Sequence, residues 1–337
     1  MNSPAARFLN PAEAARRLGV SAKALRLYEQ RGLLTPARTE AGWRSYGPGE
    51  MARGAEIAAL RKLGLSLAQV ARVLQGDAAG LEPALAAHQA MLEGRVRQLG
   101  DTMEKVRGLR AGLARGRAPA AGELARLLKP AEGLCIAFDL PWPWGGERFE
   151  LRGIRSLNYI VGPLGSGKTR LAMRLAETIP GAAFLGLDRT ASPGAALAPA
   201  VAEALAWLVE DGATASGALA ALLAGLAAEG PSALVVDLVE QGLDPATQQA
   251  LIAHLRRRGP GGRPLFMLTR SCVILDLAAV GDDESIILCP ANHSPPTLVA
   301  PYPGAAGYEA VASCLATPEV RARTEGVIAW RPRREAA

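Results

Sequence analysis

A single segment, residues 157–177, constrains the fold of this chain more than any other part of it. The segment reads LNYIVGPLGSGKTRLAMRLAE, an apolar run followed by a glycine-rich loop and then by an amphipathic helical pattern. The loop matches the phosphate-binding pattern Gly-x4-Gly-Lys-Ser/Thr in its required strand–loop–helix setting. Because such a loop joins a buried strand to a helix, the surrounding residues are predicted to form an α/β domain.

The residue types of this loop suit the binding of ATP with Mg2+. Glycines let backbone N–H groups curl around phosphate oxygens, and the N-terminus of the following helix adds partial positive charge. Lys168 is expected to contact the β- and γ-phosphates, and the Thr169 hydroxyl to coordinate Mg2+. Asp237 ends the apolar run 233–236, where a carboxylate reaches Mg2+ through water. The predicted nucleotide-binding residues are Gly162, Gly165, Ser166, Gly167, Lys168, Thr169 and Asp237.

Charge is distributed unevenly along the chain. The net charge is +6, and residues 1–76 alone carry 12 basic and 5 acidic side chains, so this segment holds the whole positive excess. A small basic segment of this kind is typical of a module that binds nucleic acid. Apolar runs long enough to span a bilayer are missing, and the N-terminus lacks the layout of a secretory signal, so we expect a cytoplasmic protein without membrane contact.

The basic segment has the punctuation of a helix-turn-helix. Asn10, Pro11 and Glu13 suit the start of a helix that Gly19 ends, and Ser21 suits the start of a second helix over residues 22–31. A stretch rich in Gly and Pro then predicts a β-wing, followed by helices over 48–63 and 67–75. Side chains of the second helix and the wing suit a major groove and its phosphates. The predicted DNA-binding residues are Lys23, Arg26, Tyr28, Arg38, Arg44 and Tyr46.

These residues resemble the winged DNA-binding domain of the MerR family of bacterial transcription regulators. The family's motif Leu-Arg-x-Tyr-Glu-x-x-Gly-Leu-Leu is matched by Leu25, Arg26, Tyr28, Glu29, Gly32, Leu33 and Leu34. Its wing motif Gly-Tyr/Trp-Arg-x-Tyr is matched by Gly42, Trp43, Arg44 and Tyr46. The resemblance covers about residues 8–76. It implies a domain at 1–76 that reads a pseudo-palindromic operator in double-stranded DNA and affects RNA polymerase indirectly, through the shape of the promoter.

Residues 77–118 carry a heptad pattern. Apolar residues recur every seven positions, at Leu85, Leu92, Leu99, Val106 and Leu113. The intervening seam is filled by His88, Val96, Met103 and Leu109. This pattern predicts a coiled-coil dimerisation helix, and the alternative is a single helix that lies on its own α/β domain. The MerR resemblance implies antiparallel pairing in a homodimer. A linker is predicted at 119–130 and the P-loop ATP-binding domain at 131–330.

The segment 237–258, DLVEQGLDPATQQALIAHLRRR, resembles the Walker B and D-loop region of ABC-type ATPases. In that family Asp237 would bind magnesium and residues 242–245 would form the D-loop. Three features depart from the family. Leu238 replaces the glutamate that polarises water, Arg270 occupies the position of the switch histidine, and the signature around Ser216 is degenerate. General-base positioning is worth about 10² to 10⁴ in rate, so ATP binding with at most weak hydrolysis is expected unless Glu240 substitutes.

The whole sequence thus predicts an N-terminal all-α winged helix-turn-helix with a long dimerisation helix, joined to a C-terminal α/β P-loop NTPase domain. The favoured function is transcription regulation with ATP as ligand or switch. Two alternatives stay open: a regulator fused to a P-loop small-molecule kinase, and an ATP-dependent DNA-maintenance ATPase. Trp142 and Trp144 precede the P-loop strand and suit either adenine stacking or core packing.

Overall fold

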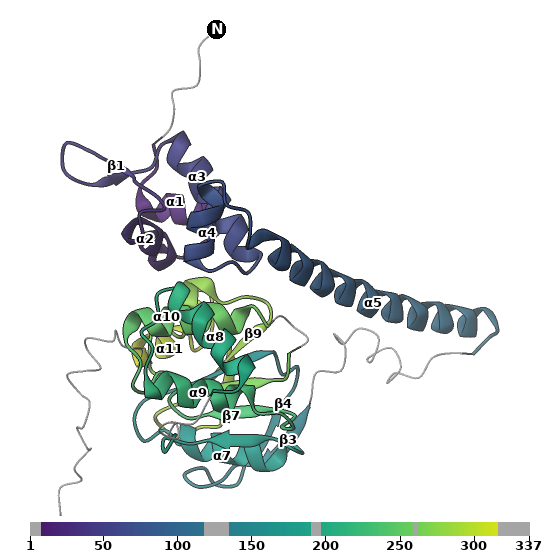
Figure 1. Ribbon diagram of the computed structural model, residues 1–337. Helices are drawn as coiled ribbons and strands as arrows, with labels where there is room; N and C mark the ends of the chain where they lie inside the picture. Colours follow the sequence, from purple (N-terminus) through teal and green to yellow (C-terminus); the bar gives the residue numbers. More distant parts are fainter. Residues whose placement is uncertain (1–7, 118–134, 190–196, 259–261, 316–337) are drawn as a thin grey trace, which may run out of the picture.

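The computed structural model describes residues 8–117, 135–189, 197–258 and 262–315. The predicted linker at 119–130 lies outside the described residues, as do the two ends of the predicted P-loop domain, at 131–134 and 316–330. The described chain forms a helical N-terminal unit, one long helix and a C-terminal α/β unit (Figure 1). We call the N-terminal unit, residues 9–76, the head, and the described residues 135–315 the P-loop domain.

The head is a small helical bundle with a two-stranded wing. Its elements are α1 (Pro11–Leu18), α2 (Ala22–Gln30), β1 (Ala37–Arg38), β2 (Arg44–Ser45), α3 (Pro48–Lys62) and α4 (Leu67–Leu74). Asn10 and Glu13 form a reciprocal capping box at the start of α1, as the sequence predicts. The predicted last residues of three helices, Arg31, Leu63 and Gln75, lie one position beyond the helices and act as C-caps.

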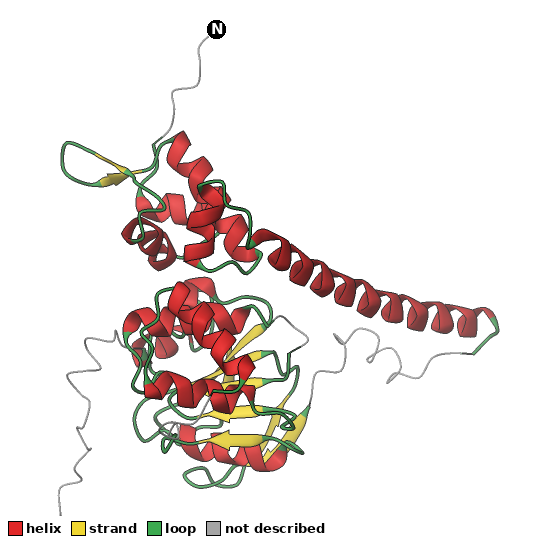
Figure 2. Ribbon diagram, viewed as in Figure 1, coloured by secondary structure: helices red, strands yellow, loops and turns green. Residues whose placement is uncertain are grey.

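Helix α5 (Leu81–Ala114) projects away from the head (Figures 1 and 2). Its 34 residues span about 51 Å at 1.5 Å per residue. Large apolar side chains are exposed along it: Leu85, Leu92, Val96, Leu99, Met103 and Leu113. A helix packed along its own α/β domain would bury these side chains, so the structure does not support that alternative.

The P-loop domain is built on a six-stranded sheet in the order β10-β9-β5-β8-β7-β6. The strands β9 (Glu284–Leu288), β5 (Leu157–Val161), β8 (Leu265–Leu268), β7 (Leu234–Val236) and β6 (Ala183–Leu185) run parallel, and only β10 (Thr297–Val299) is antiparallel to its neighbour. These strands are almost wholly apolar because helices or a hairpin cover both faces of the sheet (Figure 2).

Alternate residues of each strand belong to two different cores, as the two-residue period of a strand requires. On one face, Tyr159, Val236 and Met267 pack against α8 (Pro199–Glu210), α9 (Gly217–Ala227), α10 (Pro245–Arg256) and α11 (Tyr308–Cys314). On the other face, Ile160, Val235 and Phe266 pack against α7 (Lys168–Thr178) and the hairpin of β3 (Ile136–Asp139) and β4 (Arg148–Leu151). A short 3-10 helix, η1 (Leu277–Ala279), precedes β9.

The predicted fold class is confirmed: the chain has a helical winged head and an α/β domain with a mixed, mostly parallel sheet. Among the described residues, no helix has the length and apolarity of a bilayer span.

Candidate functional site

The predicted nucleotide site lies at the carboxyl edge of the parallel strands. Strand β5 ends at Val161, the glycine-rich loop follows, and α7 begins at Lys168. Strand β7 ends one residue before Asp237, and β8 ends two residues before Arg270. Open α/β sheets bind their ligands at this edge, so the fold brings loop, acid and arginine together although more than 100 residues separate the first from the last.

Two glycines of the loop are required by their surroundings. Gly167 has φ +88°, and a Cβ there would lie 2.6 Å from Cη2 of Trp144. A Cβ at Gly162 would collide with the carbonyl oxygen of Cys289 and lie 2.7 Å from Oγ of Ser166. Because these groups approach so closely, neither position has room for a side chain, and backbone atoms form the surface of the loop. This is the arrangement that binds phosphate through N–H groups.

Lys168, Thr169 and Asp237 converge within hydrogen-bond distance of the loop. Lys168 Nζ donates to the carbonyl oxygens of Gly162 at 2.7 Å and Pro163 at 2.6 Å. The Thr169 hydroxyl donates to Oδ2 of Asp237 at 3.2 Å. Hydroxyl and carboxylate oxygens are the ligands that Mg2+ prefers, so this pair has the chemistry of a magnesium site beside the loop.

Burial perturbs both charged groups of the site in the direction that disfavours charge. Desolvation lowers the pKa of Lys168 and raises the pKa of Asp237, although the Thr169 hydrogen bond and the Arg189 charge partly oppose the second shift. Because charges of both signs are partly desolvated here, the site has stronger electrostatic interactions than the surface would allow.

Two arginines that the sequence did not single out as nucleotide ligands border the same site. Arg189 follows β6 and donates to the carbonyl oxygen of Leu238 at 2.8 Å and to Gln241 at 3.1 Å. The Nη1 atom of Arg189 and the Nε atom of Arg270 are buried and have no hydrogen-bond partner among the described residues. Arg270 also lines a cavity of about 470 Å³ next to Gly162 and Pro163. Buried cationic donors without partners are costly, and an anion would satisfy them.

The segment after β7 has structural partners that the sequence does not reveal. Oε1 of the buried Glu240 accepts the backbone N–H of Arg270 at 3.0 Å, which ties the end of β7 to the end of β8. Asp244 caps α10 through the N–H of Thr247, and Ser216 caps α9 through the N–H of Leu219. These two residues, from the predicted D-loop and the predicted degenerate signature, therefore cap helices in the folded domain.

The two tryptophans before the P-loop separate into different environments. Trp144 is buried against Gly167, and its indole N–H donates to the carbonyl oxygen of Ser294 at 3.0 Å. Trp142 is 76% exposed and precedes Pro143, whose ring also borders Gly167. Core packing thus accounts for Trp144, whereas Trp142 presents an accessible aromatic face near the loop.

The predicted DNA-binding residues also divide by exposure. Lys23 and Arg26 on α2 and Arg38 on β1 are exposed, and Arg44 is partly exposed and pairs with Glu29 at 2.6 Å. Tyr28 and Tyr46 lie in the core of the head, and the Tyr46 hydroxyl donates to Glu29. Direct contact of these two tyrosines with DNA conflicts with their burial, because both side chains belong to the hydrophobic core of the head. We correct their role to packing, and Tyr46 also orients Glu29.

Comparisons with known proteins match different parts of the chain. Residues 9–77 match the model of the MerR HTH family regulatory proteins. A heavy metal-dependent transcription regulator of Rhizobium meliloti is 40% identical over 67 residues, 20% of this chain and 46% of the relative. An ABC transporter ATP-binding/permease protein of Mycobacterium tuberculosis is 31% identical over 91 residues, 26% of this chain and 10% of the relative. This chain thus spans about half, or less, of the length of the curated relatives it matches.

A solved dimeric bacterial ABC transporter cassette is 14% identical, with a TM-score of 0.31, and the match covers 47% of this chain and 94% of the cassette. The N-terminal segment therefore matches MerR HTH regulators in sequence, as its motifs predicted.

Proposed function

We propose that this chain is a dimeric, DNA-binding transcription regulator of the MerR type whose P-loop domain binds ATP with Mg2+ as a ligand or switch. Hydrolysis is slow or absent. The observation that carries the nucleotide half of the proposal is the convergence of Lys168, the Thr169–Asp237 pair and two arginines with unpartnered buried donors at one edge of the sheet.

The residues fit an ATP–Mg2+ complex by their chemistry. The N–H groups of residues 162–167 and Lys168 would hold phosphate oxygens, Thr169 and Asp237 would hold Mg2+, and Trp142 offers a face for the adenine. Bound Mg2+ supplies neutralisation of the phosphate charge. Leu238 lies directly after Asp237 and offers no proton acceptor, and Arg270 occupies the switch position, which supports binding with slow or absent turnover.

The DNA half of the proposal rests on the head. Lys23 and Arg26 lie on the second helix of the helix-turn-helix, and Arg38 and Arg44 lie on the two strands of the wing. Helix side chains reading a groove and wing arginines holding phosphates would together set the position of the head on a duplex.

The exposed apolar face of α5 supports the dimer. Leu92, Leu99 and Leu113 lie seven or fourteen residues apart and are 45%, 65% and 54% exposed. A second copy of the same helix would cover this stripe by knobs-into-holes packing, and two heads would then meet two operator half-sites. Regulation of RNA polymerase at a promoter would follow indirectly, from the DNA geometry that the dimer imposes.

Calorimetry with Mg-ATP on the full chain tests the nucleotide proposal. Wild type should bind and Lys168→Ala should not, because the alanine lacks the ammonium that meets the phosphates. Turnover should stay below about one per second in both proteins, at the low end of ordinary enzymes. Turnover of several per second that Lys168→Ala abolishes would contradict the non-enzymatic reading, and the absence of any ATP or ADP binding to wild type would remove the switch.

A further inference from the structure

The head and the P-loop domain are held together by a charged contact that the proposed function does not use. Arg61 of α3 donates through Nη1 and Nη2 to the two carboxylate oxygens of Asp211, at 2.6 and 3.1 Å. The Asp211 side chain is only 2% exposed and the Arg61 side chain 17%. A bidentate, buried pair between residues 150 positions apart is a specific contact, because removing either partner would leave an uncompensated buried charge.

Asp211 also caps a helix of the head. Its Oδ1 atom accepts the backbone N–H of Leu67 at 2.7 Å, and Leu67 is the first residue of α4. The first N–H groups of a helix have no partner within the helix, so the P-loop domain supplies the hydrogen-bond acceptor for the first N–H of α4. Ser66 adds a hydrogen bond to Glu210 at 3.1 Å.

Trp207 completes the surface on the P-loop domain. The Arg61 guanidinium lies 5.8 Å from the centre of its indole ring, and the Arg257 guanidinium lies 4.6 Å from it. Trp207, Glu210, Asp211 and Arg257 therefore form a continuous docking surface, contributed by α8 and the end of α10, for the α3–α4 side of the head.

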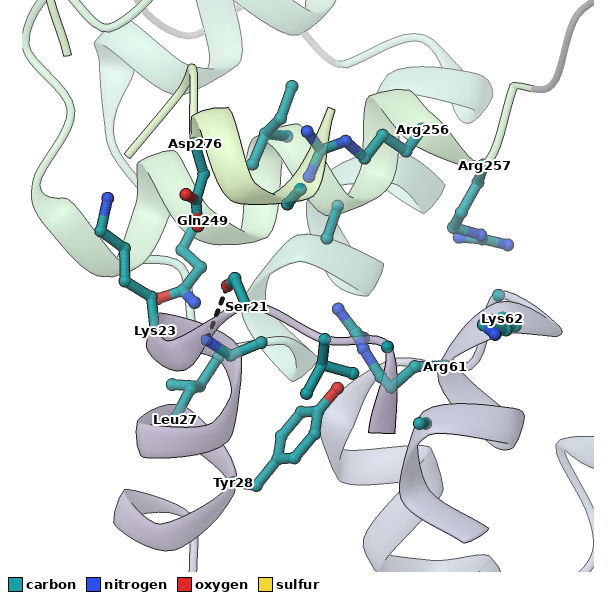
Figure 3. Close-up of a pocket in the computed structure, with 18 of the residues that line it drawn as sticks. Ser21, Lys23, Leu27, Tyr28, Arg61, Lys62, Gln249, Arg256, Arg257 and Asp276 are labelled. Atoms are coloured by element: carbon teal, nitrogen blue, oxygen red, sulfur yellow. Dashed lines mark hydrogen bonds between the residues drawn. The ribbon is translucent and has the colours of Figure 1, made fainter. Parts of the chain in front are cut away.

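The docked position sets the P-loop domain opposite the end of α2 that would enter a DNA groove, while the Lys23 and Arg26 side chains themselves stay exposed. Lys23, the second residue of α2, donates from Nζ to the carbonyl oxygen of Cys272 at 2.6 Å. Figure 3 shows Ser21 and Lys23 on one side of a cleft and Gln249 and Asp276 on the other. In helix-turn-helix proteins the N-terminal residues of the second helix contact the bases, and here α10 and the segment after β8 stand opposite those residues.

The cleft is too small for DNA. Its volume is about 640 Å³, and Lys23 and Arg26 of α2 and Arg256 of α10 are among its lining residues. The end of α2 must enter a major groove to reach base edges, and α10 stands where the duplex would lie, so DNA cannot approach α2 from this side while the cleft is closed. Arg61 of the head and Arg257 of the P-loop domain both lie over the Trp207 ring, and this proximity of like charges weakens the closed state.

We infer that the chain with its head docked is a state that cannot bind DNA. In this state the surface of Trp207, Glu210, Asp211 and Arg257 holds the head, and Lys23 is hydrogen-bonded to the Cys272 carbonyl oxygen. DNA binds only after the head leaves this surface. The inference rests on the proposed DNA-binding function and is independent of whether the P-loop binds ATP.

The test compares the affinity of the full chain and its variants for a fluorescent duplex of about 30 base pairs of arbitrary sequence, at about 50 mM salt, where phosphate contacts dominate. Asp211→Asn removes the charge that holds Arg61, and adding Trp207→Leu removes the aromatic partner as well. If the head is docked in about nine molecules of ten, its release tightens the apparent Kd about tenfold. Asp139→Asn is the matched control, because it makes the same charge change at an exposed side chain at the end of β3.

The charge swap Arg61→Asp with Asp211→Arg keeps the net charge of wild type and restores an attractive pair, so it should return the weak wild-type affinity. This result would also show that Asp211→Asn did not act by misfolding. Hydrogen exchange at the Leu67 amide reports docking separately, since its partner is Asp211. The amide should be protected in wild type and exposed in Asp211→Asn.

The inference is overturned if Asp211→Asn and the double variant bind the duplex no more tightly than Asp139→Asn does. A Leu67 amide that exchanges freely in wild type would also overturn it. The proposed DNA-binding function fails in a different way: then neither wild type nor any variant binds the duplex.

Discussion

Replacing Asp237 by asparagine should stabilise the nucleotide-free protein and at the same time abolish its stabilisation by ligand. Burial raises the pKa of Asp237, and the hydrogen bond from Thr169 offsets only part of the shift. The ionised carboxylate therefore costs folding free energy at neutral pH. Asparagine keeps the shape and an oxygen for the Thr169 hydroxyl, so the free energy of unfolding of the P-loop domain should rise by about 1 kcal/mol.

Ligand should reverse the ranking of the two proteins. At an Mg-ATP concentration of about 100 times Kd, wild type gains about 2.7 kcal/mol, whereas a variant that no longer binds Mg-ATP gains nothing. Wild type should then exceed Asp237→Asn by about 1.7 kcal/mol, the difference between the ligand term and the apo gain. Native-state hydrogen exchange at the amides of β5 and β7 measures this, because it reports on the P-loop domain alone in a chain with two units.

The sign of the pH dependence provides an internal check. A carboxyl whose folded pKa is raised binds protons more tightly in the folded state, so its cost appears as the pH rises above the unfolded value and is complete above the folded pKa. The apo advantage of Asp237→Asn should therefore shrink as the pH falls. Asp139→Asn should change stability by less than about 0.5 kcal/mol, since Asp139 is exposed. An apo Asp237→Asn protein less stable than wild type, or one that still gains the full ligand term, would refute the reasoning.

Three further predictions concern other parts of the chain. Glu284→Gln should lower the free energy of unfolding of the P-loop domain by about 3 kcal/mol in urea titrations, because the Glu284 side chain is only 6% exposed, pairs with Arg256 at 2.7 Å and accepts from Tyr159 at 2.7 Å. A loss below 1 kcal/mol, about what an exposed pair contributes, would contradict it. The double variant Val96→Asp, Leu99→Asp should convert the dimer to a monomer in sedimentation, because it places charges in the exposed apolar stripe of α5. Arg107→Ala on the same helix is the control. A double variant that is still dimeric would exclude α5 as the interface. Mg-ATP should change the duplex affinity of wild type but not of Lys168→Ala or Asp211→Asn, since a single residue separates Arg270, at the nucleotide edge, from Cys272, at the docked head; equal responses in all three proteins would refute this route.

Local signals explain why much of the fold was predictable. The capping boxes at Asn10 and Ser66 and the left-handed Gly19 involve groups three to five residues apart, so they are visible in the sequence. The alternation of short apolar runs with helical patterns likewise indicated the α/β domain. Tyr28 and Tyr46 show the limit of such signals, because a tyrosine in a motif can serve a DNA contact or a core, and only the packing distinguishes the two.

The sequence by itself determined the chemistry of the P-loop, the type of the head and the exposed stripe of α5, because each depends on spacing within one segment. The tertiary structure alone decided the strand order, in which β8 lies between β5 and β7, and hence that Arg189 and Arg270 border the same loop as Lys168. It also decided that Asp211 caps a helix of the head. The physical reason is that these contacts join residues 30 to 249 positions apart. Which buried faces pack together decides that such residues meet, and this leaves no periodic pattern along the chain.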